Sequence, residues 1–388
     1  MEFNFDKPIS RENTNSVKFD GRHHYFGTKD VIPAWVADMD FAVPDCVTRA
    51  LEARLQHPVF GYTLYPDSLY DSIIQWFERR HGWKIERDWI LMAPGVVPSL
   101  FAAVKSFAGE GEGVIVQPPV YFPFFSSVTT NRRKLVLNRL REVNGRYEID
   151  LEHLESCAQQ GAKLLMLCTP HNPVGRVWTQ QELEAVLDIA RKHNLIILSD
   201  DIHCDLIYPG NTHTMLGKLA QPDDKIITAI APNKTFNIPG LGLSALVIPD
   251  AAQRNAMKQT FESLHVGNTN PFSIAAFEAA YREGDEWLDA LMAYLERTRD
   301  FVDDYLRENI PHIKMTKPEA TYLLWLDCRQ LGMTDAQLRG FFVKGCKVGM
   351  NPGTVFGEGG SGFMRLNIGT RKSAIEQILL SITKAINK

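Results

Sequence analysis

The sequence contains no continuous apolar run of the length that a membrane-spanning helix requires, which is about 20 residues. Its first residues, Met1–Asp6, provide neither the basic region nor the apolar region of a secretory signal. Internal repeats, low-complexity tracts and long Gly/Ser linkers are also missing. We therefore expect a cytoplasmic protein that does not associate with membranes.

Cysteines are few and are not arranged in pairs. The six of them, at positions 46, 157, 168, 204, 328 and 346, form no C-x-x-C pair and show no metal-ligand spacing. This pattern is typical of reduced thiols in a cytosolic protein. An excess of positive charge is missing too, because the net charge is −4 and the pI is near 6.3. We therefore expect no metal and no nucleic-acid partner.

What the sequence does contain is the composition of an ordinary globular protein, with 45% apolar and 23% charged residues, and its 388 residues suggest two domains. Short aliphatic runs alternate with segments of helical periodicity. This alternation predicts a three-layer αβα fold, in which helices cover both faces of a mostly parallel, mixed sheet. The expected strands are 89–92, 114–116, 163–168, 195–198, 226–230 and 243–248.

After about residue 280 the pattern changes. A long amphipathic helix over 287–305 is followed by a strand at 322–326, a helix near 334–344, a strand at 363–368 and a closing helix. We expect residues 281–388 to form a smaller α+β domain, which the N-terminal segment 1–45 joins. Residues 46–280 would then form the large domain.

One lysine, Lys234, follows the aliphatic run 226–230 within a few residues. In open α/β sheets, ligands bind just beyond the carboxyl ends of the strands. A lysine that is shielded from water there has a lowered pKa and can form an imine with an aldehyde. A single lysine in a loop is more often simply solvated, so the interpretation depends on its neighbours.

Other predicted strands end in groups that complement such a lysine. Together they match a phosphorylated pyridine aldehyde: a carboxylate for the ring nitrogen, an aromatic face for stacking, an amide for the phenolic oxygen and a helix N-terminus for the phosphate. Each group alone has an ordinary structural explanation, such as a cap, packing or a turn. The residues concerned are Gly95, Tyr121, Asn172, Asp200 and His203.

The motifs that contain these residues resemble those of a known superfamily. Residues 172–175, 199–203 and 234–241 resemble fold-type I pyridoxal-phosphate (PLP) enzymes of the class I/II aminotransferase superfamily. Residues 35–41, 119–121 and 362–367, the pair Phe356-Gly357, and His203 in place of the usual tyrosine, resemble its cystathionine β-lyase branch. The resemblance covers nearly the whole chain and implies the PLP-dependent transferase fold.

The resemblance implies a role for each of the central residues. Lys234 would bind PLP covalently and later move the Cα proton of the substrate. Asp200, in preference to the adjacent Asp201, would pair with the ring nitrogen. Asn172 would contact the phenolic oxygen of the ring, and Tyr121 would stack on its face.

The resemblance also implies how phosphate and substrate are held. Arg365 would bind the substrate carboxylate as a two-pronged fork. Tyr62 would reach the cofactor phosphate of a neighbouring subunit, which implies a homodimer with shared active sites. The other residues carried over are Gly95, Val96, Val97, Asn233 and His203 for the cofactor, and Tyr62 and Asp38 for the substrate.

The expected reaction is α,β-elimination of L-cystathionine or a related cysteine S-conjugate to a thiol, pyruvate and ammonia. An aminotransferase of aromatic or aliphatic amino acids is the alternative, since the cofactor-binding motifs serve both reactions. Asn233 stands where many relatives have serine. Gly242 stands where aminotransferases have a phosphate-binding arginine, and this second departure favours the lyase. Some lyases of this branch also regulate a transcription factor, but nothing in this sequence indicates such a surface.

Overall fold

The structure is a computed structural model that describes residues 3–267 and 269–387. Its larger part is built on a seven-stranded sheet of order β2-β10-β9-β8-β7-β3-β4. Only β10 runs antiparallel to its neighbours. The mostly parallel, mixed sheet predicted from the sequence is therefore confirmed. Its strands are β2 (Ile90–Ala93), β3 (Gly113–Val116), β4 (Lys134–Leu137), β7 (Leu164–Cys168), β8 (Ile196–Asp200), β9 (Ile226–Ile230) and β10 (Ser244–Val247).

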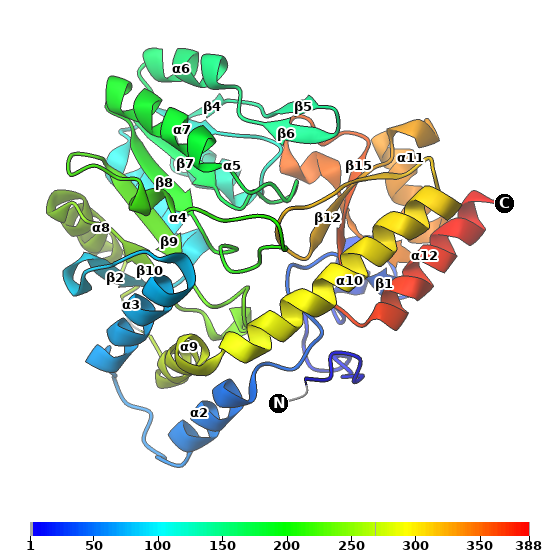
Figure 1. Ribbon diagram of the computed structural model, residues 1–388, viewed down its shortest axis with the longest axis horizontal. Helices are drawn as coiled ribbons and strands as arrows, with labels where there is room; N and C mark the ends of the chain where they lie inside the picture. Colours follow the sequence, from blue (N-terminus) through cyan, green and yellow to red (C-terminus); the bar gives the residue numbers. More distant parts are fainter. Residues whose placement is uncertain (1–2, 268, 388) are drawn as a thin grey trace.

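Helices cover both faces of this sheet, as a three-layer fold requires (Figure 1). On one face the helices are α4 (Val96–Phe107), α5 (Pro123–Thr130) and α8 (Ala251–Ser263), and on the other they are α6 (Leu151–Gln159) and α7 (Gln180–His193). Helix α7 begins at a capping box, in which Thr179 and Glu182 satisfy each other's backbone N–H groups. Its apolar stripe, which includes Leu183 and Val186, is fully buried against the sheet.

The smaller part of the molecule contains a four-stranded antiparallel sheet of order β11-β12-β15-β14. The long helix α10 packs beside α12 on its outer side (Figure 1). The N-terminal strand β1 pairs with β13 of the C-terminal part. The domain boundaries near residues 45 and 280 stay a prediction. The elements are α1 (Arg22–Phe26), β1 (Ile32–Pro33), α10 (Asp285–Asn309), β11 (Lys314–Thr316), β12 (Leu323–Asp327), α11 (Asp335–Gly340), β13 (Val348–Gly349), β14 (Asn351–Pro352), β15 (Phe363–Asn367) and α12 (Lys372–Ile386).

Several elements are not among those that the sequence predicted. The edge strand β4 has a short apolar run at 135–137 that is only partly buried, and the hairpin of β5 (Arg141–Val143) and β6 (Arg146–Glu148) is largely exposed and has no apolar run. The helix α9 (Pro271–Glu283), also not predicted, packs against α2 (Asp45–Leu55) and α3 (Asp67–His81). Within residues 3–267 and 269–387, no helix is both long and apolar enough to cross a membrane.

Candidate active site

The site is organised by two neighbouring parallel strands. Asp200 is the last residue of β8, and it lies in register with Ala229 of β9. The chain leaves β9 one residue later and reaches Lys234 after one turn. Because parallel strands end at the same edge, the carboxylate and the amine line a single cavity of about 230 Å³.

The N-terminus of α4 forms another wall of this cavity. The helix begins at Val96, and no side chain caps it at Gly95. The first N–H groups of a helix have no partner inside the helix and carry its positive dipole end. Gly95, Val96 and Val97 all line the cavity, so these donors can hold a phosphate, as the sequence predicted.

The amine of Lys234 is held by the backbone. Its Nζ donates a hydrogen bond of 2.6 Å to the carbonyl oxygen of Ala37. Burial and the charge of Arg365 lower the pKa of Lys234, the carboxylates of Asp38 and Asp200 raise it, and the net result is a pKa of about 8. A substantial fraction of the amine is therefore neutral, and so nucleophilic, near physiological pH.

The carboxyl group of Asp200 is buried and accepts a hydrogen bond of 3.2 Å from the backbone N–H of Ile202. Burial raises its pKa to about 7. This one hydrogen bond offsets little of the free-energy cost of burying a charged carboxylate. Asp200 is therefore suited to a cationic partner that enters the cavity. The adjacent Asp201 is already paired, because its oxygens accept from Ser199 at 2.5 Å and contact Nε2 of His213 at 2.9 Å. The preference for Asp200 as the partner of the ring nitrogen stays a prediction.

Hydrogen bonds connect three further residues of the site, which are Tyr121, Asn172 and Arg365. The N–H of Tyr121 donates to the carbonyl oxygen of Asn172 at 3.1 Å, so the ring and the amide are held in one frame. Nη1 of Arg365 donates to Oδ1 of Asn172 at 2.9 Å, which turns the amide nitrogen away from the guanidinium. Arg365 is buried, and burial lowers its pKa to about 10.

Two buried nitrogen atoms at the site have no hydrogen-bond partner among the described residues: Nδ1 of His203 and Nε of Arg365. Burial and the nearby Lys234 and Arg365 cations lower the pKa of His203 to about 3, so its ring is neutral. Unpaired buried polar atoms are costly unless a ligand satisfies them. With Asp200, the α4 N-terminus and Asn233 in the same cavity, the donor set fits a phosphorylated pyridine aldehyde.

A second, larger cavity of about 650 Å³ adjoins the first. Ala37, Tyr121 and Lys234 line both cavities, so the amine lies where the two meet. Arg365 lines only the larger one, whose walls are mainly apolar and aromatic. This arrangement provides two adjoining compartments, and the larger of them contains a buried arginine.

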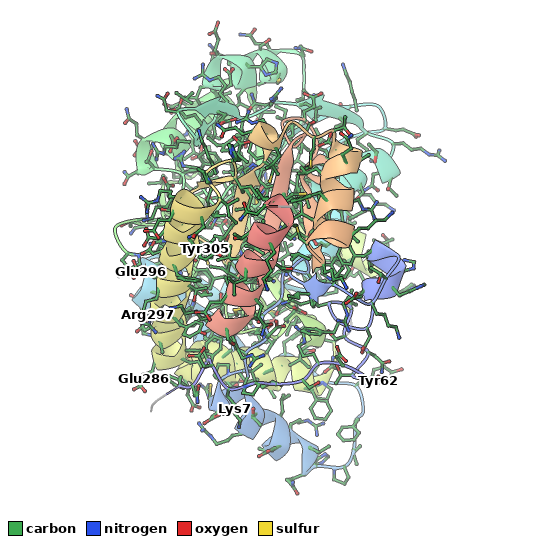
Figure 2. All side chains as sticks on the ribbon, turned by 90° about the vertical axis from the view of Figure 1, so that its right-hand side faces the viewer. Lys7, Tyr62, Glu286, Glu296, Arg297 and Tyr305 are labelled. Atoms are coloured by element: carbon green, nitrogen blue, oxygen red, sulfur yellow. The ribbon has the colours of Figure 1, made fainter. Side chains whose placement is uncertain are left out.

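Two predicted residues are not brought into the cavities of this chain. Tyr62 is fully exposed, on the loop after α2 (Figure 2). Asp38 lines neither cavity, because its carboxylate forms ion pairs with Arg11 and, more distantly, Lys18.

Two contacts of the site were missed by the sequence analysis. The carbonyl of Ala37 is a backbone group, and no side-chain pattern identifies it. The hydroxyl of Tyr322, which donates to that carbonyl at 3.0 Å, stands at the start of an apolar run that indicated only a strand.

Comparison with known proteins places this site in a family. The model of the aminotransferase class I and II family matches residues 30–382. Cystathionine beta-lyase PatB of Bacillus subtilis is 42% identical over 99% of this chain and all of its own length. Protein MalY of Escherichia coli is 32% identical over 99% of each chain. The crystal structure of cystalysin from Treponema denticola, which contains pyridoxal 5'-phosphate, is 36% identical and superposes with a TM-score of 0.96 over 100% of this chain and 99% of that one. The chain therefore belongs to the class I and II aminotransferase family, within the branch that contains PatB and MalY.

Proposed function

We propose that the protein is a PLP-dependent carbon–sulfur β-lyase that cleaves L-cystathionine or related cysteine S-conjugates. The observation that carries this proposal is the position of Lys234 where the smaller cavity, which Asp200 and Asn172 also line, meets a larger and mainly apolar one. The 42% identity to a cystathionine β-lyase over the full chain supports elimination rather than transamination. The balanced reaction converts the thioether amino acid and water to a thiol, pyruvate and ammonia.

The residues around the cofactor would hold it in a fixed orientation. When bound, PLP supplies an aldehyde that condenses with amines and a ring that withdraws the electron pair left by loss of the Cα proton. Asp200 keeps the proton on the ring nitrogen, which preserves the positive charge that makes this withdrawal effective. Tyr121 stacks on the ring, and Asn172 donates its amide N–H to the phenolic oxygen. The N–H groups of Val96 and Val97 bind the phosphate.

The remaining residues would handle the substrate. Arg365 binds its α-carboxylate as a fork, and this fixes the direction of the Cα–H bond. The neutral amine of Lys234 takes the Cα proton. The part of the substrate that is released as the thiol occupies the larger apolar cavity, and it leaves from there when the carbon–sulfur bond breaks.

Assembly and location complete the proposal. We propose a cytoplasmic homodimer, in which Tyr62 of each chain contacts the active site of the other. The loop that contains Tyr62 exposes several large apolar side chains, as a chain that pairs with a second copy would. They are Val59, Phe60, Tyr62 and Leu64, and Leu55 at the end of α2 is exposed beside them in the sequence. All six cysteines are buried and unpaired, which agrees with a reducing compartment.

The test of the proposed function combines a spectrum with a product assay. Purified protein is expected to absorb at about 420 nm, the band of an imine of PLP, and borohydride should remove this band. With cystathionine and no keto acid it should release thiol and pyruvate in equal amounts. Lys234→Ala should lose both the band and the product. Formation of glutamate from added 2-oxoglutarate, without release of thiol or pyruvate, would instead identify an aminotransferase.

A further inference from the structure

The segment Val36–Phe41 lies against the active-site lysine, although it belongs to the N-terminal part of the chain. The carbonyl oxygen of Ala37 accepts two hydrogen bonds, one from Nζ of Lys234 at 2.6 Å and one from Oη of Tyr322 at 3.0 Å. Both donors are side chains of the site. The position of one backbone carbonyl therefore determines where the lysine amine rests.

Side chains from two other parts of the chain form hydrogen bonds with the backbone of this segment. Asn237, three residues after the lysine, bonds both the N–H and the carbonyl of Met39 at 2.9 Å. Asn367, at the end of β15, donates to the carbonyl oxygens of Val36 and, at 2.7 Å, Asp38. Backbone groups on both sides of Ala37 are thus fixed by amide side chains.

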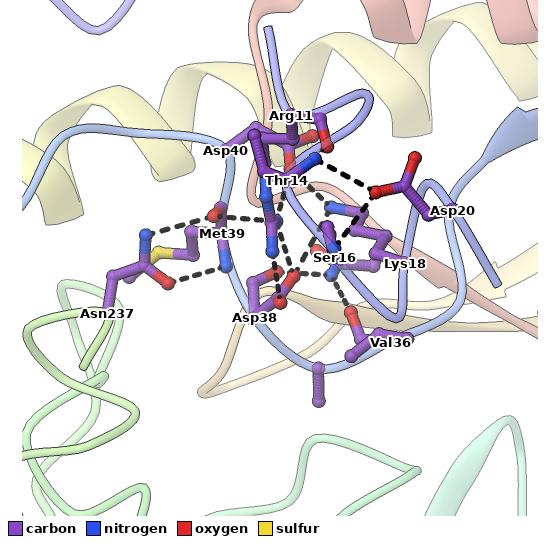
Figure 3. A network of polar contacts seen from close by, with 12 residues as sticks. Arg11, Thr14, Ser16, Lys18, Asp20, Val36, Asp38, Met39, Asp40 and Asn237 are labelled. Atoms are coloured by element: carbon purple, nitrogen blue, oxygen red, sulfur yellow. Dashed lines mark hydrogen bonds and ion pairs between the residues drawn. The ribbon is translucent and has the colours of Figure 1, made fainter. Parts of the chain in front are cut away.

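The N-terminal arm binds the same segment through ion pairs (Figure 3). Arg11 pairs with both oxygens of Asp38, at 2.8 and 2.7 Å, and with Asp40 at 2.8 Å. The fully buried Lys18 pairs with Asp40 at 3.0 Å. Two cations thus face two carboxylates in a half-buried cluster, where removal of one partner leaves an uncompensated charge.

We propose that Arg11 is a positioning residue for the reaction, because its two-point contact with Asp38 fixes the segment whose Ala37 carbonyl holds the free amine of Lys234. The inference rests on the proposed function, in which this amine takes the Cα proton. A neutral amine that donates one N–H to a fixed carbonyl keeps its lone pair in a constant direction. General bases lose rate steeply when they are displaced by about 1 Å.

The charges around the amine give Arg11 a second effect. Lys234 is faced by the charged groups of Asp38, Asp200 and Arg365 and by three neutral side chains. The carboxylate of Asp38 raises the pKa of Lys234, and burial lowers it. Without Arg11, the charge of Asp38 is less compensated, so the pKa of Lys234 rises and less of the amine is neutral at pH 7. The neutral side chains are Tyr121, His203 and Tyr322.

The test compares the holoenzyme of Arg11→Gln with the wild type. We expect kcat at neutral pH to fall about 10-fold while KM changes less than about twofold. The acid limb of the kcat profile and the pH midpoint of the cofactor absorbance should both move up by about half a unit or more. The matched control is Glu12→Gln, which breaks the exposed Arg22–Glu12 ion pair of the same arm and should change neither quantity.

A second variant separates positioning from a merely structural role. In Arg11→Gln/Asp38→Asn the uncompensated carboxylate is gone, so both pH midpoints should return toward wild type while kcat stays low. If Arg11→Gln does not fold, Arg11→Lys keeps the charge without the fork and should lower kcat with no pH shift.

Two results would overturn the inference: wild-type kcat and pH profiles in the Arg11 variant, or pH shifts that persist in the double variant. Failure of the wild type to cleave cystathionine would contradict the proposed function instead. The absorbance titration would then still test the role of Arg11.

Discussion

At the scale of single residues, the site depends on groups whose ionisation is set by burial. Lys234 is kept partly neutral, and the carboxyl group of Asp200 titrates near pH 7 until a cation joins it. These opposite shifts suit one group to act as a nucleophile and the other to pair with a cation. Neither shift follows from the sequence, because both depend on how completely the folded chain excludes water.

Arg365 allows a sharp prediction at this scale. Its guanidinium bonds Asn172, the carbonyl of Trp35 and Asn351, at 2.8 to 2.9 Å, and leaves Nε unpaired. Lysine cannot make these contacts and also bind a carboxylate in two places. Arg365→Lys should therefore lower kcat/KM for cystathionine about 100-fold, mainly through KM, with the cofactor absorbance retained.

The control for this prediction is Arg329→Lys, a change of the same kind at a half-exposed arginine that pairs with Asp327 and Glu142. It should leave kcat/KM within about twofold. An unchanged KM in Arg365→Lys would contradict the assignment of the substrate carboxylate to Arg365. Steady-state kinetics at a fixed pH decide between these outcomes.

At the scale of elements, the start of α4 can be tested one N–H group at a time. Proline is tolerated at the first position of a helix, where it removes only an N–H that has no helical partner. Val96→Pro should therefore fold but weaken PLP binding about 10-fold, because one phosphate donor is lost. Val96→Ala removes the buried side chain and keeps the N–H, so it measures the packing effect alone. Fluorescence titration of the apoprotein with PLP gives both dissociation constants.

If Val96→Pro and Val96→Ala bind PLP equally, the phosphate does not depend on this N–H. The elements themselves were largely predictable, because strands such as β8 and β9 are mainly aliphatic and buried. The edge strand β4 and the hairpin β5–β6 were not, since the apolar run of β4 is short and the hairpin is largely exposed.

At the scale of the whole molecule, the prediction concerns Tyr62. If it completes the site of the partner chain, a heterodimer of Lys234→Ala and Tyr62→Phe chains contains one site with both residues intact. An equimolar co-expressed mixture of these two weakly active variants should then recover about a quarter of wild-type activity. Activity no higher than the mean of the two separate variants would place Tyr62 outside the shared site. Sedimentation analysis of the same samples checks that they are dimeric.

The sequence by itself determined the order of strands and helices and the side chains that carry the chemistry. Lys234, Asp200, Asn172, Tyr121 and the start of α4 all follow apolar strands or precede a helix, so the rule that parallel strands end at one edge brings them together. This rule needs only the positions of apolar runs and helix starts, which can be read directly from the sequence.

Only the tertiary structure decided what surrounds those residues. It placed the Ala37 carbonyl on the lysine amine, paired Asp38 with Arg11 and left Tyr62 outside its own site. These contacts join segments up to 197 residues apart through a backbone carbonyl and partly buried charges. No local periodicity encodes such contacts, because they arise only when the N-terminal arm packs against the completed sheet.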